Sequence, residues 1–167
     1  MTTKDVAKEA QVNEVTLFRQ FGSKKELLLT TLKEAEWIPS VNLEIYDDFQ
    51  WDLASDLRLI MEAYLKQVTP EIVRFSLGLR AQEIYQETMP YIEKIPTAFI
   101  QTLEDYLIRM KLKKQVTIHD PKRTAEIIFS SMIGFAFLHA YSSSDQYESE
   151  AEIFISHAVN QFINGLV

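Results

Sequence analysis

Three histidines are the residues of this sequence best suited to a metal site or to acid–base catalysis: His119, His139 and His157. None has another histidine or an acidic residue three or four positions away, the spacing at which two side chains of one helix bind a metal together. The chain contains no cysteine, no glycine-rich phosphate loop and no Gly-x-Ser-x-Gly nucleophile motif. We therefore predict a protein that is not an enzyme and that holds no metal or cofactor.

Composition and charge narrow the class of protein. Hydrophobic residues make up 47% of the 167 residues, with only 4 Gly and 5 Pro, which favours an all-α fold over many short strands and turns. No apolar run approaches the roughly 18 residues of a membrane span, and the start has no secretion signal, so we predict a cytoplasmic protein. The net charge of −7 is uneven. Residues 1–37 carry six basic and six acidic side chains, so this electroneutral segment could still present cations to nucleic acid.

Helix signals in the first 37 residues predict three short helices in succession. Polar residues with capping potential precede each amphipathic stretch: Thr3, Asn13 and Ser23 before 4–10, 14–21 and 24–37. Two short helices joined by a tight turn predict a helix-turn-helix motif, whose second helix enters the major groove of DNA. We therefore divide the chain into a DNA-binding head, residues 1–37, and a helical body, residues 38–167.

A stretch of the head resembles the DNA-binding domain of TetR-family transcriptional regulators: TTKDVAKEAQVNEVTLFRQFGSKKELL. The family pattern is roughly Thr-x-x-Ile-Ala-x-x-Ala-Gly-Val-Ser, followed by x-x-Thr-Leu-Tyr-x-x-Phe-x-x-Lys-x-x-Leu. The sequence matches it at Thr3, Val6, Ala7, Ala10, Val12, Thr16, Leu17, Phe21, Lys24 and Leu27. The body resembles the family in architecture only.

The resemblance implies how the head contacts an operator in double-stranded DNA. Phosphate contacts fall to Thr3, Lys4, Thr16 and Lys24. Base reading falls to Glu14, Val15, Arg19 and Gln20. The chemistry of these side chains agrees, since arginine binds guanine, glutamine binds adenine, glutamate accepts from cytosine N4, and valine contacts the thymine methyl group.

Three departures from the family pattern support an alternative interpretation. Gln11 replaces a turn glycine whose φ is expected to be positive, which costs roughly 1 kcal/mol. Phe18 replaces a tyrosine and so lacks the hydroxyl that contacts phosphate. The family's first helix has no counterpart here, so we expect a partial head. The alternative is a helical dimeric ligand-binding protein of the same fold that has lost DNA binding.

The body pattern predicts five helices: 52–68, 70–86, 96–113, 121–141 and 148–166. Pro90 and Pro96 are expected to flank a short helical turn. The fourth helix has a nearly uncharged interior, IIFSSMIGFAFLHA, which predicts that a partner chain covers one side of it. Pairing of the last two helices across a two-fold axis would give a four-helix bundle with these interface residues: Ile127, Ser130, Gly134, Phe137, Ile155, Ala158 and Phe162.

The resemblance further implies a repressor that leaves its operator when a small, partly apolar effector binds the body. Methionine and aromatic side chains suit an adaptable cavity. The predicted pocket residues are Met61, Tyr64, Phe75, Arg80, Phe99, Leu103, Tyr106, Met132, Phe135 and His139. Ordinary core packing is the alternative role for these side chains.

Overall fold

The computed structural model describes residues 2–34, 47–80, 84–142 and 146–166. Within these ranges the chain forms helices and no strand, so the all-α prediction is confirmed. The helices are α1 (Thr3–Glu9), α2 (Glu14–Phe21), α3 (Lys24–Glu34), α4 (Leu53–Gln67), α5 (Pro70–Arg80), α6 (Tyr85–Ile92), α7 (Lys94–Leu112), α8 (Pro121–Ala140) and α9 (Tyr147–Leu166). None of those described is both long enough and apolar enough to cross a membrane.

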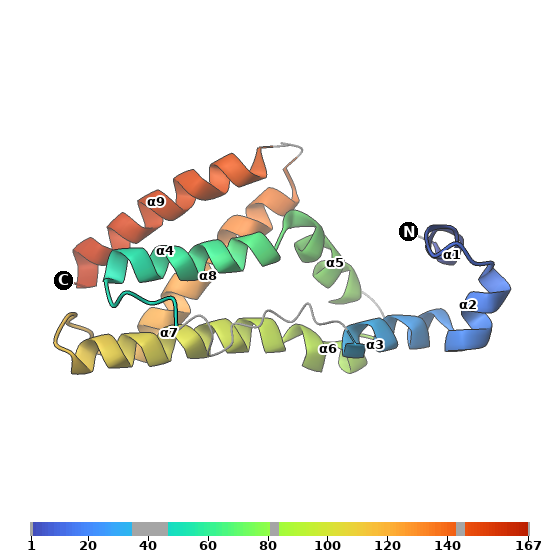
Figure 1. Cartoon of the computed structure of the whole chain (residues 1–167), viewed down its shortest axis with the longest axis horizontal. Coiled ribbons are helices and arrows are strands. Elements are labelled where there is room, and N and C mark those ends of the chain that lie inside the picture. The colour runs from blue at the N-terminus through green and yellow to red at the C-terminus, as the bar shows by residue number, and fades with distance from the viewer. Residues whose placement is uncertain (1, 35–46, 81–83, 143–145, 167) are drawn as a thin grey trace.

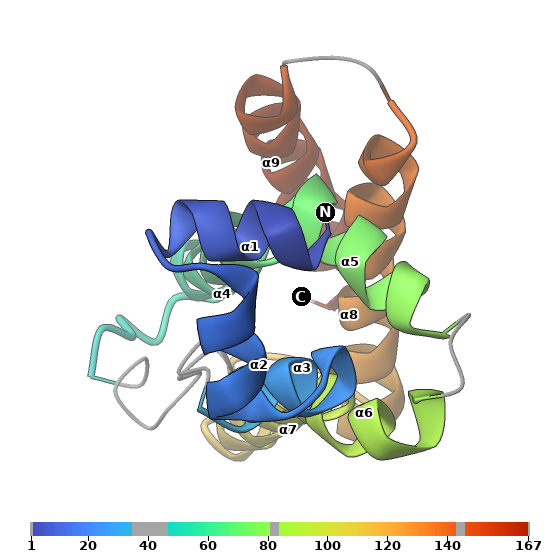
Figure 2. The same ribbon diagram turned by 90° about the vertical axis from the view of Figure 1, so that its right-hand side faces the viewer.

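The molecule is elongated, with a small head at one end of a helical body (Figure 1). Helices α1, α2 and α3 form the head, and the C-terminus lies at the opposite end of the body. Seen from the head end, α1 and α2 stand in front of the body helices (Figure 2). Helix α3 packs against α6, which joins the head to the body. The arrangement therefore places α1 and α2 at the tip of the molecule.

Side-chain caps define where the head helices begin. Thr2 caps α1, because its hydroxyl accepts the Asp5 amide while the Asp5 carboxylate accepts the Thr2 amide. This reciprocal pair sets the helix start one residue earlier than predicted, so Thr3 is the first helical residue and not the cap. Asn13 caps α2 as expected, with its side-chain oxygen accepting the Thr16 amide at 2.7 Å.

Two residues with positive φ end the first two helices. Gly22 follows α2 with φ 76°, a value that glycine adopts without strain. Gln11 follows α1 with φ 55°, which confirms the conformation expected at this position. Its own amide bonds to the Lys8 carbonyl, and the Val12 amide bonds to the Ala7 carbonyl. This is the Schellman arrangement, which satisfies the last carbonyls of the helix.

Helix α3 begins at the predicted capping residue. The Ser23 hydroxyl accepts the Glu26 amide at 3.1 Å. The structure describes this helix to Glu34, so the predicted end near Trp37 falls outside the described residues.

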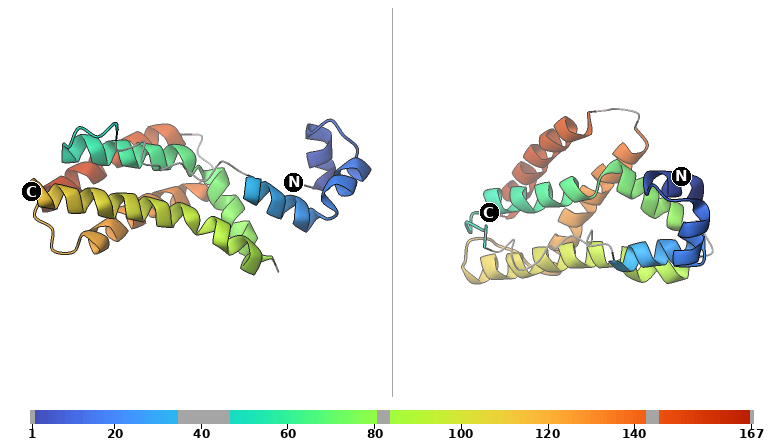
Figure 3. Two further views of the ribbon diagram at one scale, coloured as in Figure 1. Left: turned by 60° about the horizontal axis from the view of Figure 1, so that its bottom comes forward. Right: turned by 45° about the vertical axis from the view of Figure 1, so that its right-hand side comes forward.

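The core of the body lies where α4 meets α7, α8 and α9. Tyr64 of α4 is 1% exposed, and its ring makes T-shaped contacts with the rings of Phe99 and Phe129, at 4.8 Å and 5.3 Å between ring centroids. Such aromatic pairs add about 0.5–1.5 kcal/mol to the stability gained from burial alone. Helix α7 also packs along much of α8, and two further views show α4, α7 and α8 together (Figure 3).

A buried carboxylate connects α4 to α7. Asp56 is 1% exposed and accepts the Tyr106 hydroxyl at 3.0 Å and the Gln50 amide at 2.9 Å. Burial, and then the nearby Asp56 carboxylate, raise the pKa of the Tyr106 phenol. Next to this pair, Trp51 has φ 60°, and the Lys113 ammonium lies 3.4 Å from its ring centroid. These contacts hold the segment before α4 against the end of α7.

The body helices follow the predicted ranges with one exception. Those expected over 52–68, 96–113, 121–141 and 148–166 appear as α4, α7, α8 and α9. The structure describes the helix expected over 70–86 as far as Arg80, and residues 81–83 lie outside the described residues. A single helix to Gln86 is wrong, because Ile84 is the non-helical residue before α6, a separate helix that contains Pro90. Pro96 lies in the first turn of α7, where proline is tolerated because the amides there have no partner within the helix. The two prolines are therefore inside helices and do not flank a separate turn.

Candidate nucleic-acid interface

Helix α2 exposes one face and buries the other. Val15 is 76% exposed and Phe18 is 37% exposed, and the polar side chains of Arg19 and Gln20 are exposed as well. On the opposite face, Leu17 is 6% exposed and forms part of the core of the head. An eight-residue helix is roughly 12 Å long, which matches the width of the major groove of DNA. The exposed face of α2 therefore has the size and the polar side chains of a groove-reading helix.

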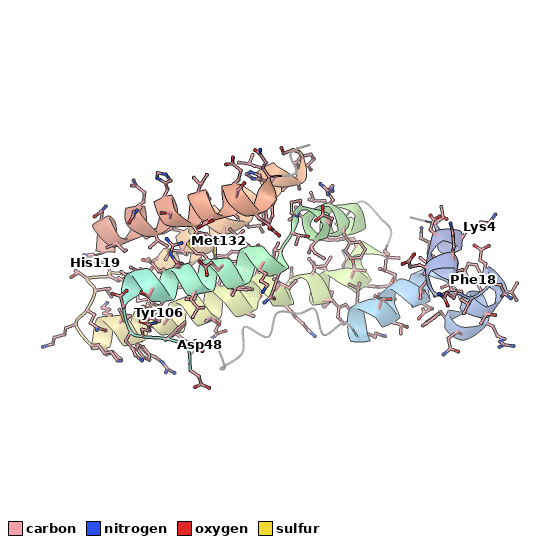
Figure 4. The ribbon with its side chains drawn as sticks, turned by 45° about the horizontal axis from the view of Figure 1, so that its top comes forward. Lys4, Phe18, Asp48, Tyr106, His119 and Met132 are labelled. Atoms are coloured by element: carbon pink, nitrogen blue, oxygen red, sulfur yellow. The ribbon has the colours of Figure 1, made fainter. Side chains whose placement is uncertain are left out.

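Two exposed lysines of the head are placed where phosphate groups could meet them. Lys4 lies on α1 and projects from the head (Figure 4). Lys24 is the first residue of α3, where the unpaired amides of a helix start add a partial positive charge. Their role as phosphate contacts stays a prediction, which requires both lysines to be exposed, as they are.

Three other predicted DNA contacts are engaged within the head. The Thr16 hydroxyl donates to the Asn13 side-chain oxygen at 2.9 Å. The Thr3 hydroxyl donates to the carboxylate of Glu14, which links the first residues of α1 and α2. The sequence analysis missed the second bond, because a contact between side chains eleven residues apart depends on how the two helices cross. Both hydroxyls would have to exchange these partners before they could donate to phosphate.

An ion pair joins the head to the body. The Lys25 ammonium lies 2.6 Å from the Glu87 carboxylate, so the pair connects α3 to α6. This hydrogen bond raises the pKa of Lys25. The contact directs Lys25 toward α6 of the body, although both Lys25 and its neighbour Lys24 are exposed. No signal in the sequence identified Glu87 as the partner, since its helix was not predicted.

Six of the predicted pocket residues lie in the centre of the body core. Each is at most 1% exposed: Met61, Tyr64, Phe99, Leu103, Tyr106 and Met132. Tyr106 and Met132 are labelled inside the body in Figure 4. Phe135 is 9% exposed and stacks on Phe154, with 4.5 Å between ring centroids. Protein cores are closely packed, so a ligand at this position would have to displace some of these side chains.

The remaining predicted pocket residues lie apart from that core. Phe75 is 40% exposed and lines a hollow of about 490 Å³ between α1, α3 and α5. His139 lines a different hollow of about 630 Å³, where α5, α8 and the start of α9 meet. Arg80 ends α5, and its side chain lies outside the described residues.

The histidines are distributed over separate parts of the body. His119 is exposed in the connection between α7 and α8, at the end of the molecule opposite the head (Figure 4). His157 is exposed on α9, and the Nδ1 atom of half-buried His139 lies 3.0 Å from the Phe135 carbonyl oxygen. Across the ranges that the structure describes, no three histidine, aspartate or glutamate side chains are placed to hold a metal ion together.

One face of α8 is apolar and exposed. The large side chains on it are Ile127 (62% exposed), Ile133 (41%), Phe137 (42%) and Leu138 (70%). Exposed Ser130 and half-exposed Gly134 lie between Ile127 and Phe137 in the sequence. The four positions are separated by three, four and three residues, so they share one side of the helix. The sequence from 127 to 142 contains no lysine, arginine, aspartate or glutamate. A continuous apolar surface of this kind is typical of a protein interface.

Helix α9 differs from its predicted role. Ile155 is 3% exposed in the core of its own subunit, contrary to the exposed position that an interface residue requires. Ala158 and Phe162 are half-buried against the same core. The helical period correctly placed these residues on one face, but that face meets α4. Ile153, which is 54% exposed, lies outside this buried face.

The fold combines a helix-turn-helix head, whose second helix α2 has an exposed face, with a helical body. Residues 1–31 match the family described as "Bacterial regulatory proteins, tetR family". The chain is 26% identical over 166 residues to "Uncharacterized HTH-type transcriptional regulator YvkB" of Bacillus subtilis (strain 168), an alignment that covers 99% of this chain and 86% of the relative. No solved structure matches the chain significantly. The first 31 residues therefore resemble bacterial regulatory proteins of the tetR family, and nearly the whole chain is similar to an HTH-type transcriptional regulator.

Proposed function

We propose that this protein is a TetR-type regulator, and specifically a homodimeric repressor that binds a near-palindromic operator and leaves it when a small molecule binds the body. The observation that carries the proposal is the exposed face of α2, where Val15, Arg19 and Gln20 project from the tip of the molecule. Regulators of this family are generally DNA-binding proteins without catalytic activity, and we propose the same here.

The proposed contacts follow from the exposure of each side chain in the head. Lys4 and Lys24 contact phosphates from either side of α2, and Thr16 joins them once its internal hydrogen bond exchanges. Thr3 contacts phosphate only at sites where its hydroxyl has released Glu14. The base-reading set is Glu14, Val15, Arg19 and Gln20. Arg19 and Gln20 have the donors and acceptors for guanine and adenine, and Val15 offers apolar contact to a thymine methyl group.

The apolar face of α8 supports the proposed dimer. Self-association through this face would bury Ile127 and Phe137 and let the backbones approach at Gly134. A two-fold axis there would present two copies of α2 to one face of a duplex. The two copies must reach successive major grooves, about 34 Å apart, so operator affinity depends on the spacing of the heads.

Release by an effector follows from that dependence on spacing. A small, partly apolar molecule that enters the body among the methionine and aromatic side chains must separate some of them, because they are in contact without it. A ligand that binds better to a subunit with altered head spacing shifts the population toward that conformer and lowers operator affinity. The contact between α3 and α6 is the connection through which a change in the body would reach the head.

The experiment is fluorescence anisotropy with DNA from upstream of the protein's own gene, at several salt concentrations. Lys24→Ala should weaken binding to all duplexes and lower the salt dependence by about one counterion. Arg19→Ala should relax the preference at one base position, at a cost of about 1–3 kcal/mol. Lys122→Ala is the matched control, because this exposed lysine lies three residues from His119, at the end away from the head. Absence of salt-sensitive binding would contradict the proposal and favour a ligand-binding protein without DNA affinity.

A further inference from the structure

The hydrogen bond between Thr3 and Glu14 fixes a carboxylate at the predicted DNA-facing end of the head. The two residues are the first of α1 and α2, and both side chains are half-buried. The next residue of each helix is exposed, Lys4 on α1 and Val15 on α2. The bonded pair therefore lies between a predicted phosphate-binding cation and the most exposed apolar residue of the recognition helix.

A carboxylate at this position opposes binding to any duplex, because DNA carries a continuous line of phosphate charges. Residues 3–21 contain three basic and three acidic side chains, so a single carboxylate decides the sign of the local charge. One of the other acids, Asp5, is held by the cap at Thr2, and the hydrogen bonds from Thr2 lower the pKa of Asp5. The bond to Glu14 also occupies the only proton of the Thr3 hydroxyl, which leaves Thr3 unable to donate to phosphate while the bond persists.

We propose that the Thr3–Glu14 pair is a specificity element that penalises DNA lacking a suitable base next to it. Glu14 accepts from Thr3 through one carboxylate oxygen, and its other oxygen stays able to accept from a base-edge donor such as the N4 amino group of cytosine. At a site with that donor, the hydrogen bond offsets the repulsion from phosphates. At other sites the repulsion between the Glu14 carboxylate and the phosphates remains. The protein therefore discriminates between sequences as much by binding unsuitable DNA more weakly as by binding the suitable site more tightly.

Thr3 acts as a positioning residue in this scheme. Its hydroxyl fixes the direction of the Glu14 carboxylate, so that the free oxygen faces one base position. Without the hydroxyl the charge persists but its direction is no longer fixed. Loss of the charge and loss of the hydroxyl should therefore have different effects on DNA binding.

The test rests on the proposed DNA binding and compares two duplexes by fluorescence anisotropy: one of random sequence, and one selected by the wild-type protein from a random pool. Glu14→Gln keeps an acceptor for Thr3 but removes the charge, so affinity for random DNA should rise about five-fold, as expected for one charge pair in water. Affinity for the selected duplex should stay the same or fall. Glu9→Gln is the control, because it removes the same charge from the exposed end of α1 and should change either affinity less than two-fold.

Variants of Thr3 separate the charge of Glu14 from its orientation. Thr3→Val should leave affinity for random DNA within two-fold and weaken binding to the selected duplex about ten-fold. Thr3→Ser, which keeps the hydroxyl, should restore that binding. Unchanged affinity of Glu14→Gln for random DNA, or an equal rise in Glu9→Gln, would overturn the proposal while the proposed function stands. Failure of the wild-type protein to bind any duplex would instead overturn the proposed function and this inference with it.

Discussion

Replacing Phe137 with alanine should weaken self-association of the chain about a thousandfold. A phenylalanine buries roughly 200 Å² when it is fully covered. Phe137 is 42% exposed in the single subunit, so about 80 Å² remains for a partner to cover, worth about 2 kcal/mol at 25 cal/mol per Å². In a two-fold symmetric dimer the change occurs twice, and about 4 kcal/mol corresponds to nearly three powers of ten in the dissociation constant.

Sedimentation velocity over a range of protein concentrations measures this change. Leu112→Ala is the matched control, because Leu112 is 77% exposed at the end of α7, a more exposed position than that of Phe137. The control should leave the dissociation constant unchanged. Equal effects of the two substitutions, or a wild-type protein that stays monomeric at high concentration, would refute the assignment of the exposed α8 face as the dimer interface.

Three further predictions concern stability. Gln11→Gly should raise the free energy of unfolding in urea by about 1 kcal/mol, because glycine adopts φ 55° without strain. Gln11→Ala is the control and should give no such gain. A lower free energy of unfolding in the glycine variant would contradict the Schellman geometry. Tyr106→Phe should lower the free energy of unfolding by about 1–3 kcal/mol, because buried Asp56 loses a hydrogen-bond donor. The same change at half-exposed Tyr91 should have little effect. Equal losses of stability in the two variants would contradict the role of the Tyr106–Asp56 hydrogen bond. Burial raises the pKa of Tyr147 to about 12. The folded state therefore keeps a proton that the unfolded chain releases near pH 10. Because of this difference, the free energy of unfolding should fall as the pH rises from about 10 to 12. Urea titrations at several pH values should show this slope and a smaller one in Tyr147→Phe, whereas a flat wild-type profile would refute it.

Local signals made the head largely predictable from the sequence. Asn13 and Ser23 cap their helices because capping uses a side chain and an amide only three residues apart. The positive φ at Gln11 followed from the turn that the motif requires. The start of α1 was predicted one residue late, because Thr2 and Thr3 are equally suited to cap a helix, and only the reciprocal bond with Asp5 distinguishes them.

Contacts between distant parts of the chain could not be predicted in the same way. The Thr3–Glu14 bond depends on the crossing of α1 and α2, and the Lys25–Glu87 pair depends on the packing of α3 on α6. For α9, periodicity identified an apolar face but not the surface that covers it, and Ile155 proved to face its own core. An apolar stripe predicts burial, and only the packing of the other helices decides between the subunit's core and a partner.

For the candidate pocket, too, the sequence could not distinguish a ligand cavity from a packed core. Methionine and aromatic residues at helical spacing are required both for a close-packed core and for an adaptable cavity. Met61, Met132 and Phe99 are fully buried, which agrees with the core role. Their role in effector binding stays a prediction, since the sequence pattern is the same for both.

The central claim is that α2 enters the major groove at two places on one duplex. The chain has no cysteine, so Val15→Cys introduces a single thiol on the exposed face of α2, to which an iron chelate that cleaves nearby DNA can be attached. With DNA selected by the wild-type protein, cleavage should occur at two positions about one helical turn apart, whereas the chelate attached through Leu112→Cys should leave the DNA intact. Cleavage of equal strength from both attachment sites, or none from the recognition helix, would contradict the account.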